Sequence, residues 1–180
     1  MFNILLIDDE IMIIHALTRL IRRSLPEDTH IEGFIDPHAA LNRVKEKRFD
    51  IIMSDYRMPS MNGIELLKQA AEIQPDASRL ILSATEDFSV LMQAINEAEI
   101  MSFLPKPWED QVLIDTILKA ANTSQQTRNE HLLADERRLD MKALSPQEVE
   151  KRRLEQEEPG LTTANWNEEG AIVISENEAS

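Results

Sequence analysis

The sequence predicts an α/β fold in which helices cover both faces of a five-stranded parallel sheet. Two observations lead to this fold class. Five short apolar segments alternate along residues 1–122 with five segments whose apolar residues recur at helical spacing. Most of the short segments are apolar at nearly every position, as expected for strands buried on both faces. This pattern is typical of a doubly wound parallel sheet.

The first half of the domain contains two strands and two helices. A strand is expected at 3–7, followed by a helix over 11–23 whose last turn carries two arginines that match the helix dipole. A weaker strand follows at 30–34. Asp36 and Pro37 are typical of an N-cap and a first helical position, so the next helix is expected to begin there and to end near residue 47.

The second half repeats the alternation three times. Each strand is a short apolar run, and each helix carries its apolar residues on one face. The expected elements, in chain order, are a strand at 49–54, a helix at 63–72, a strand at 79–83, a helix at 88–98, a strand at 100–104 and a helix at 108–122.

Polar side chains capable of chemistry follow four of these strands. Asp8 and Asp9 follow the first strand, Asp55 the third, Ser83 ends the fourth and Lys106 follows the fifth. Right-handed crossovers bring the carboxyl ends of these strands to one edge, where ligands of open α/β sheets bind. Three carboxylates without His or Cys favour a hard cation such as Mg²⁺. Lysine and a hydroxyl would suit a phosphoryl group.

Each of these residues also has an ordinary explanation when it is taken alone. An Asp-Asp pair after a strand is more often a helix cap, and Asp55 could be a turn aspartate. Ser83 could be a strand-end hydroxyl and Lys106 a solvated lysine. Their combination within one α/β unit favours a functional site.

Residues 1–122 resemble the receiver domain of bacterial two-component response regulators. The matching motifs are Leu-Leu-Ile-Asp-Asp-Glu at 5–10, Asp-Tyr-Arg-Met-Pro-Ser-Met-Asn-Gly at 55–63, Leu-Ser-Ala at 82–84 and Phe-Leu-Pro-Lys-Pro at 103–107. The resemblance implies a flavodoxin-like receiver fold. It also implies that a sensor histidine kinase or phosphotransfer protein is the phosphoryl donor.

The resemblance further implies a role for each matching residue. Asp55 would be the phosphoacceptor, Lys106 would pair with the phosphoryl oxygens, and Ser83 would donate a hydrogen bond to one of them. Phe103 matches the switch aromatic that moves with Ser83, and the Lys106–Pro107 bond is expected to be cis. The Mg²⁺ ligands would be Asp9, Asp55 and the main-chain carbonyl of Arg57, with Asp8 bound mainly through water.

The composition limits the environment and the partners. The net charge of −14 argues against nucleic acid or an anionic membrane as a partner. There is no cysteine, no basic leader and no apolar run of about 20 residues, so a cytoplasmic protein is expected.

Residues 123–180 form an extension that resembles no family we recognise. A charged helical segment is expected over 123–158: residues 123–140 could continue the fifth helix and pair two chains, and a second charged helix is expected from residue 145 to about residue 158. Ser145 and Glu148 form a capping box with proline at the first helical position. Residues 159–180 are either a β-hairpin, with strands at 161–166 and 171–175, or a disordered acidic tail.

Three functions are therefore compared. The leading one is a non-enzymatic response regulator that signals by phosphorylation-dependent protein contact or dimerisation, with its downstream target unknown. The second is a DNA-binding transcriptional regulator that acts through the extension, against which the scarcity of basic residues counts. The third is a phosphatase-like enzyme with Asp55 as nucleophile, but Arg57 stands where a dedicated acid or base would be expected.

Overall fold

The computed structural model describes residues 2–84, 99–140, 145–157, 165–166 and 172–173. The helix expected over 88–98 lies outside these residues, as does most of the expected acidic tail. The described residues include the sheet, four of the five expected helices and the helical extension.

Five parallel strands form one sheet, in the order β2-β1-β3-β4-β5. The predicted fold class is confirmed, and strand bounds differ from the expected ones by at most two residues. The strands are β1 (Asn3–Ile7), β2 (His30–Phe34), β3 (Ile51–Asp55), β4 (Ser78–Ser83) and β5 (Ser102–Pro105). The order reverses between β1 and β3, so the carboxyl ends of these two strands flank the crevice where such sheets bind ligands.

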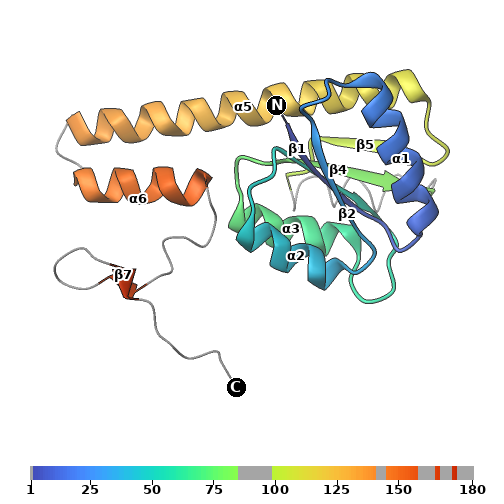
Figure 1. Cartoon of the computed structure of the whole chain (residues 1–180), viewed down its shortest axis with the longest axis horizontal. Coiled ribbons are helices and arrows are strands. Elements are labelled where there is room, and N and C mark those ends of the chain that lie inside the picture. Colours follow the sequence, from blue (N-terminus) through green and yellow to red (C-terminus); the bar gives the residue numbers. More distant parts are fainter. Residues whose placement is uncertain (1, 85–98, 141–144, 158–164, 167–171, 174–180) are drawn as a thin grey trace.

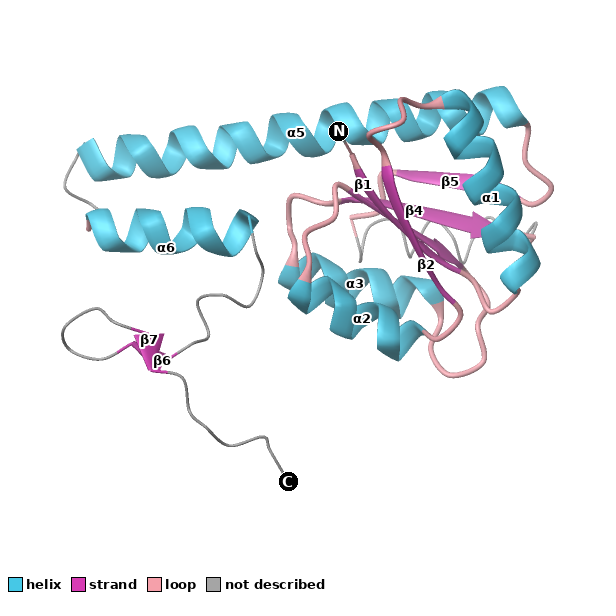
Figure 2. Ribbon diagram, viewed as in Figure 1, coloured by secondary structure: helices cyan, strands magenta, loops and turns pink. Residues whose placement is uncertain are grey.

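Helices cover both faces of the sheet (Figures 1 and 2). Alternate residues of each strand point to opposite faces. Leu5 and Ile7 contribute to a core beneath α2 (Pro37–Glu46) and α3 (Gly63–Ile73). Their neighbours Ile4 and Leu6 belong to the opposite core, which α1 (Ile11–Ser24) and α5 (Asp110–Asp140) cover.

The predicted helix caps are confirmed. The Asp36 side chain accepts a hydrogen bond of 3.0 Å from the main-chain N–H of His38, with Pro37 at the first helical position. The capping box also forms, because the Glu148 N–H donates to Ser145 Oγ and the Glu148 carboxylate accepts from the Ser145 N–H at 2.8 Å. This capping box precedes α6 (Pro146–Glu157).

The last helix of the α/β domain does not end at residue 122. It continues as a single helix of 31 residues, so the continuation of the fifth helix is observed, and α6 is the expected second helix. The sequence places the end of the fifth helix near residue 122 because polarity rises there, but polarity alone does not end a helix. No glycine or proline lies between residues 108 and 145, and the side chains after Asn122 are mostly good helix formers.

Beyond α5 the chain turns back (Figure 1), so that α6 lies alongside the second half of α5. The expected hairpin is present as two short antiparallel strands, β6 (Asn165–Trp166) and β7 (Ile172–Val173). Among the described residues, no helix combines the length and the apolar character that crossing a bilayer requires.

Candidate functional site at the carboxyl edge of the sheet

The topology brings Asp8, Asp55 and Lys106 together at the carboxyl edge of the sheet. The ammonium of Lys106 lies 2.6 Å from Asp8 Oδ2 and also contacts Asp55 Oδ1. All three side chains are largely buried, with 1%, 8% and 14% of their surface exposed, respectively. The prediction that these strand-end residues meet is confirmed.

Main-chain groups fix the two carboxylates. The N–H of Arg57 donates a 2.6 Å hydrogen bond to Asp55 Oδ2, and the N–H of Glu10 donates one of 3.0 Å to Asp8 Oδ1. In each carboxylate, one oxygen accepts a hydrogen bond from a main-chain N–H and the other contacts the Lys106 ammonium. The two side chains are therefore held on either side of this ammonium group.

Burial and the ion pairs act on the titration of these groups in opposite directions. Burial raises the pKa of Asp8, and the hydrogen bond from Lys106 only partly offsets this. For Lys106, burial acts to lower the pKa, but the hydrogen bonds to Asp55 and Asp8 outweigh it and the pKa is raised. Lys106 is therefore a firmly protonated cation, as a site for an anionic group requires.

Ser83 and Phe103 lie beside this cluster on β4 and β5. Ser83 is buried at the end of β4, and its carbonyl accepts a 2.8 Å hydrogen bond from the Lys106 N–H. Phe103 is half-buried against the core that lies beneath α2 and α3. The Lys106–Pro107 bond is cis, as expected.

Asp9 and Arg57 differ from the other predicted residues, because both side chains are exposed. Among the described residues, no three acidic or histidine side chains are grouped closely enough to hold a metal ion as they stand. The donor set nevertheless fits a hard divalent cation. Three carboxylates against one lysine leave a net charge of about −2 at this edge, and carboxylates offer only oxygen donors.

Sequence reasoning missed two residues that shape the loop after Asp55. Gly63 lies against the Asp55 carbonyl so closely that a Cβ would overlap it, and its N–H donates a 2.9 Å hydrogen bond to the Tyr56 carbonyl. Ser54 Oγ donates to the Asp55 carbonyl at 2.9 Å. The Asn-Gly pair at 62–63 was a signal for a tight turn, but only the fold reveals what the glycine touches.

A doubly wound five-stranded sheet with paired aspartates and a lysine at its carboxyl edge defines the receiver class of signalling domains. The model of the response regulator receiver domain matches residues 4–118. The chain belongs to this family, whose members act in two-component signalling.

Individual relatives share the domain in larger proteins. The hydrogenase transcriptional regulatory protein HoxA of Cupriavidus necator is 30% identical over 139 residues, which cover 77% of this chain and 27% of HoxA. The cyclic di-GMP phosphodiesterase response regulator RpfG of Xanthomonas campestris is 28% identical over 158 residues, covering 85% of this chain and 40% of RpfG. The chain thus spans less than half of the length of either relative.

The fold has a close solved counterpart. The signal receiver domain of an HD domain-containing protein from Pseudomonas fluorescens Pf-5 is similar to this chain with a TM-score of 0.66 and 30% identity. The likeness covers 71% of this chain and 91% of that domain. It therefore concerns the α/β domain and at most part of the helical extension.

Proposed function

We propose that the chain is a response regulator switched by phosphorylation of Asp55. A sensor histidine kinase or phosphotransfer protein would be the donor, and the output would be phosphorylation-dependent protein contact or dimerisation. The observation that carries the proposal is the position of the Asp55 carboxylate, held between the Arg57 N–H and the Lys106 ammonium beside buried Asp8.

The transfer step uses the chain's own residues mainly for positioning. An Asp55 oxygen would attack the phosphorus of a phosphohistidine as the bond from phosphorus to the histidine nitrogen breaks, and Lys106 would pair with the phosphoryl oxygens. Phosphoryl transfer requires such alignment and charge neutralisation more than covalent help. Asp8, Asp9, Asp55 and the Arg57 carbonyl would hold Mg²⁺, which when bound would neutralise part of the phosphoryl charge.

The packing around Ser83 supports a switch. A phosphoryl group adds a charge of about −1.5 to −2 next to Lys106. The Ser83 carbonyl already accepts from the Lys106 N–H, so β4 and β5 are joined where the new charge would act. We infer that Ser83 would move to donate to the phosphoryl group and that half-buried Phe103 would repack with it.

The test is labelling of Asp55 by a small acyl phosphate in the presence of Mg²⁺. Asp55→Asn should abolish the acid-labile label, while Asp115→Asn, which removes an exposed carboxylate from α5, should retain it. Label that persists in the Asp55 variant would identify another acceptor. Beryllofluoride with Mg²⁺ should also shift the amide signals of Ser83 and Phe103, and an unchanged spectrum would contradict a working switch.

A transcriptional role is the second candidate, and the name of HoxA favours it. Our expectation that nucleic acid is no partner rested on charge alone, and the relatives do not support it. The net charge of −14 remains an electrostatic obstacle to direct DNA binding by this chain. Titration of duplex DNA at low and moderate salt, with and without beryllofluoride, decides between the candidates, since binding that weakens with salt would favour the second.

We also propose that the chain itself catalyses no multiple-turnover reaction. RpfG is named a phosphodiesterase, but the matched part of this chain covers only 40% of it. At this site Arg57, two residues after Asp55, is exposed and is no general acid or base. Steady hydrolysis of an aryl phosphate that Asp55→Asn abolishes would contradict this expectation.

A further inference from the structure

The helical extension packs on the α/β domain almost without apolar burial. Among the described side chains of residues 125–137 and 145–157, Asp135 is the only buried one. No residue of α6 is buried, although α6 contacts α5 along its length. An isolated 12-residue helix is marginal in water, so α6 requires contacts to remain helical. Its apolar side chains Val149 and Leu154 are only partly buried, so polar contacts must supply part of the attachment.

Two buried carboxylates lie at polar contacts of the extension. Asp135 Oδ1 on α5 accepts a 2.8 Å hydrogen bond from Arg152 on α6, and only 8% of the Asp135 side chain is exposed. Asp76, just before β4, has 7% of its side chain exposed and lies 2.5 Å from His131 Nδ1 on α5. The first contact joins α6 to α5, and the second places His131 of α5 beside the segment that precedes β4.

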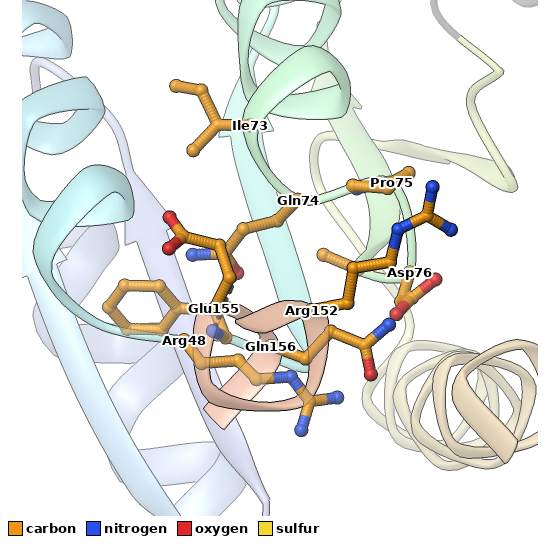
Figure 3. A pocket seen from close by; sticks show the side chains of 10 residues that line it. Arg48, Ile73, Gln74, Pro75, Asp76, Arg152, Glu155 and Gln156 are labelled. Atoms are coloured by element: carbon orange, nitrogen blue, oxygen red, sulfur yellow. Dashed lines mark hydrogen bonds between the residues drawn. The ribbon is translucent and has the colours of Figure 1, made fainter. Parts of the chain in front are cut away.

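A cavity of about 170 Å³ lies where α6 faces the α/β domain (Figure 3). Apolar parts of the α/β domain line one side, and Arg152 and Gln156 of α6 line the other. Gln156 Oε1 is buried and has no hydrogen-bond partner among the described residues. The apolar lining comes from Phe49, Ile73, Pro75 and Ala77. The contact is therefore not packed to the density of a core.

We propose that α6 is a releasable latch, held over the amino-terminal edge of the sheet by the Arg152–Asp135 ion pair. Its release uncovers the cavity lining at Phe49, Pro75 and Ala77 while the α/β domain stays folded. This edge lies opposite the Asp55 site, so the proposal does not depend on phosphorylation. Segments with little apolar burial open far more easily than the whole domain.

The ion pair is suited to a latch because its two members are unequally buried. Arg152 is 53% exposed and can return to water readily, whereas only 8% of the Asp135 side chain is exposed and it gives up the Arg152 hydrogen bond when α6 leaves. Weakening the pairing of a buried charge is costly. The Arg152–Asp135 contact thus favours the closed state, and removing it should make the latch open more often.

The experiment is native-state hydrogen exchange of the full chain, measured residue by residue. In the wild type, amides of α6 should be protected but should exchange at least about a hundredfold faster than those of β3. Arg152→Gln should speed exchange in α6 about tenfold or more and leave β3 unchanged. The matched control is Arg153→Gln. It removes the same charge from the neighbouring residue, but Arg153 pairs with the exposed Glu150 of its own helix.

A double-mutant cycle makes the test specific. Asp135→Asn should also speed exchange in α6, and the double variant with Arg152→Gln should add little to either single change. The exposed pair Arg153 and Glu150 should show no such coupling. Three results would each overturn the proposal. The first is an equal effect of Arg152→Gln and Arg153→Gln on exchange in α6. The others are exchange of wild-type α6 at free-peptide rates and loss of protection in β3 together with α6.

Discussion

The main-chain carbonyl of Asp55 lies directly against the α-carbon of Gly63, eight residues further along the chain. An added Cβ at Gly63 would overlap that carbonyl, and the Gly63 N–H is bonded to the Tyr56 carbonyl at 2.9 Å. The first turn of α3 is thereby pressed against the end of β3. Glycine is required here because of close approach between backbones.

Gly63→Ala should consequently displace the loop that carries Asp55. We expect a loss of about 2 kcal/mol in the free energy of unfolding, typical of overpacking, because the nearest atoms belong to backbone and cannot swing away. Labelling of Asp55 by a small acyl phosphate should also slow at least about tenfold. Urea unfolding and the rate of labelling measure the two effects.

Gly33→Ala is the matched control for this prediction. A Cβ there would also be crowded, but by the side chain of Ile14. The variant should lose stability through that contact and keep a normal rate of Asp55 labelling. If both glycine variants slowed labelling equally, the contact between Gly63 and Asp55 would have no special role.

The sheet and the acidic cluster could be predicted from the sequence because both follow from local pattern and topology. An apolar run sets each strand, and parallel connection brings its last residue to one edge, so Asp8, Asp55 and Lys106 had to converge. The role of Gly63 could not be assigned in this way. Its importance arises from the close approach of the end of β3 to the first turn of α3, which no periodicity encodes.

In the extension, too, local structure could be predicted from the sequence but tertiary contacts could not. Its helical character followed from composition and the capping box at Ser145. The contact between α5 and α6 could not be predicted, because a polar helix has no apolar stripe that would indicate which helix it packs against. The pairing of Arg152 with Asp135 joins residues on two helices whose alignment depends on the turn between them.

Lys106→Met should destabilise the domain when no divalent metal is present. Asp8 and Asp55 would then lie close together, buried and without their shared cation. Leaving buried charge uncompensated costs about 3 kcal/mol. Urea unfolding in a chelator measures the loss, and adding Asp8→Asn should restore part of it by removing the repulsion.

Lys119→Met is the control for charge, because Lys119 is exposed on α5. It should change the free energy of unfolding by less than about 0.5 kcal/mol. Equal losses for the two lysine variants would show that overall charge, and not the carboxylate pair, sets the effect.

Gln74 joins three segments of the α/β domain. Its amide nitrogen donates to the carbonyls of Val44 and Lys47 at 2.6 and 2.8 Å, and its amide oxygen accepts from the Phe49 N–H at 2.9 Å. Gln74→Ala would leave buried backbone groups unpaired, so we expect a loss of about 2 to 4 kcal/mol in the free energy of unfolding. Gln69→Ala, on α3 just before Gln74 and with only a weak contact to Met61, should cost less than about 1 kcal/mol.

Glu32 should make the stability depend on pH in the acidic range. Its carboxylate accepts hydrogen bonds of 2.8 and 3.1 Å from Arg43 and 2.9 Å from Lys47. The Arg43 hydrogen bonds are the main cause that lowers the pKa of Glu32 from 4.5 to about 2. Because the folded pKa is depressed, the stabilisation is fully present above pH 4.5 and is lost as the pH falls toward 2.

Glu32→Gln should lower the free energy of unfolding by about 1 kcal/mol at pH 7, a modest value for a partly exposed network. The difference from the wild type should shrink between pH 4.5 and 2, where the wild-type carboxylate is itself protonated. Urea unfolding at a series of pH values measures both. Glu46→Gln removes a second, more exposed partner of Arg43 and should give a small difference that hardly changes with pH. A constant gap between Glu32→Gln and wild type down to pH 2 would contradict the ion-pair explanation.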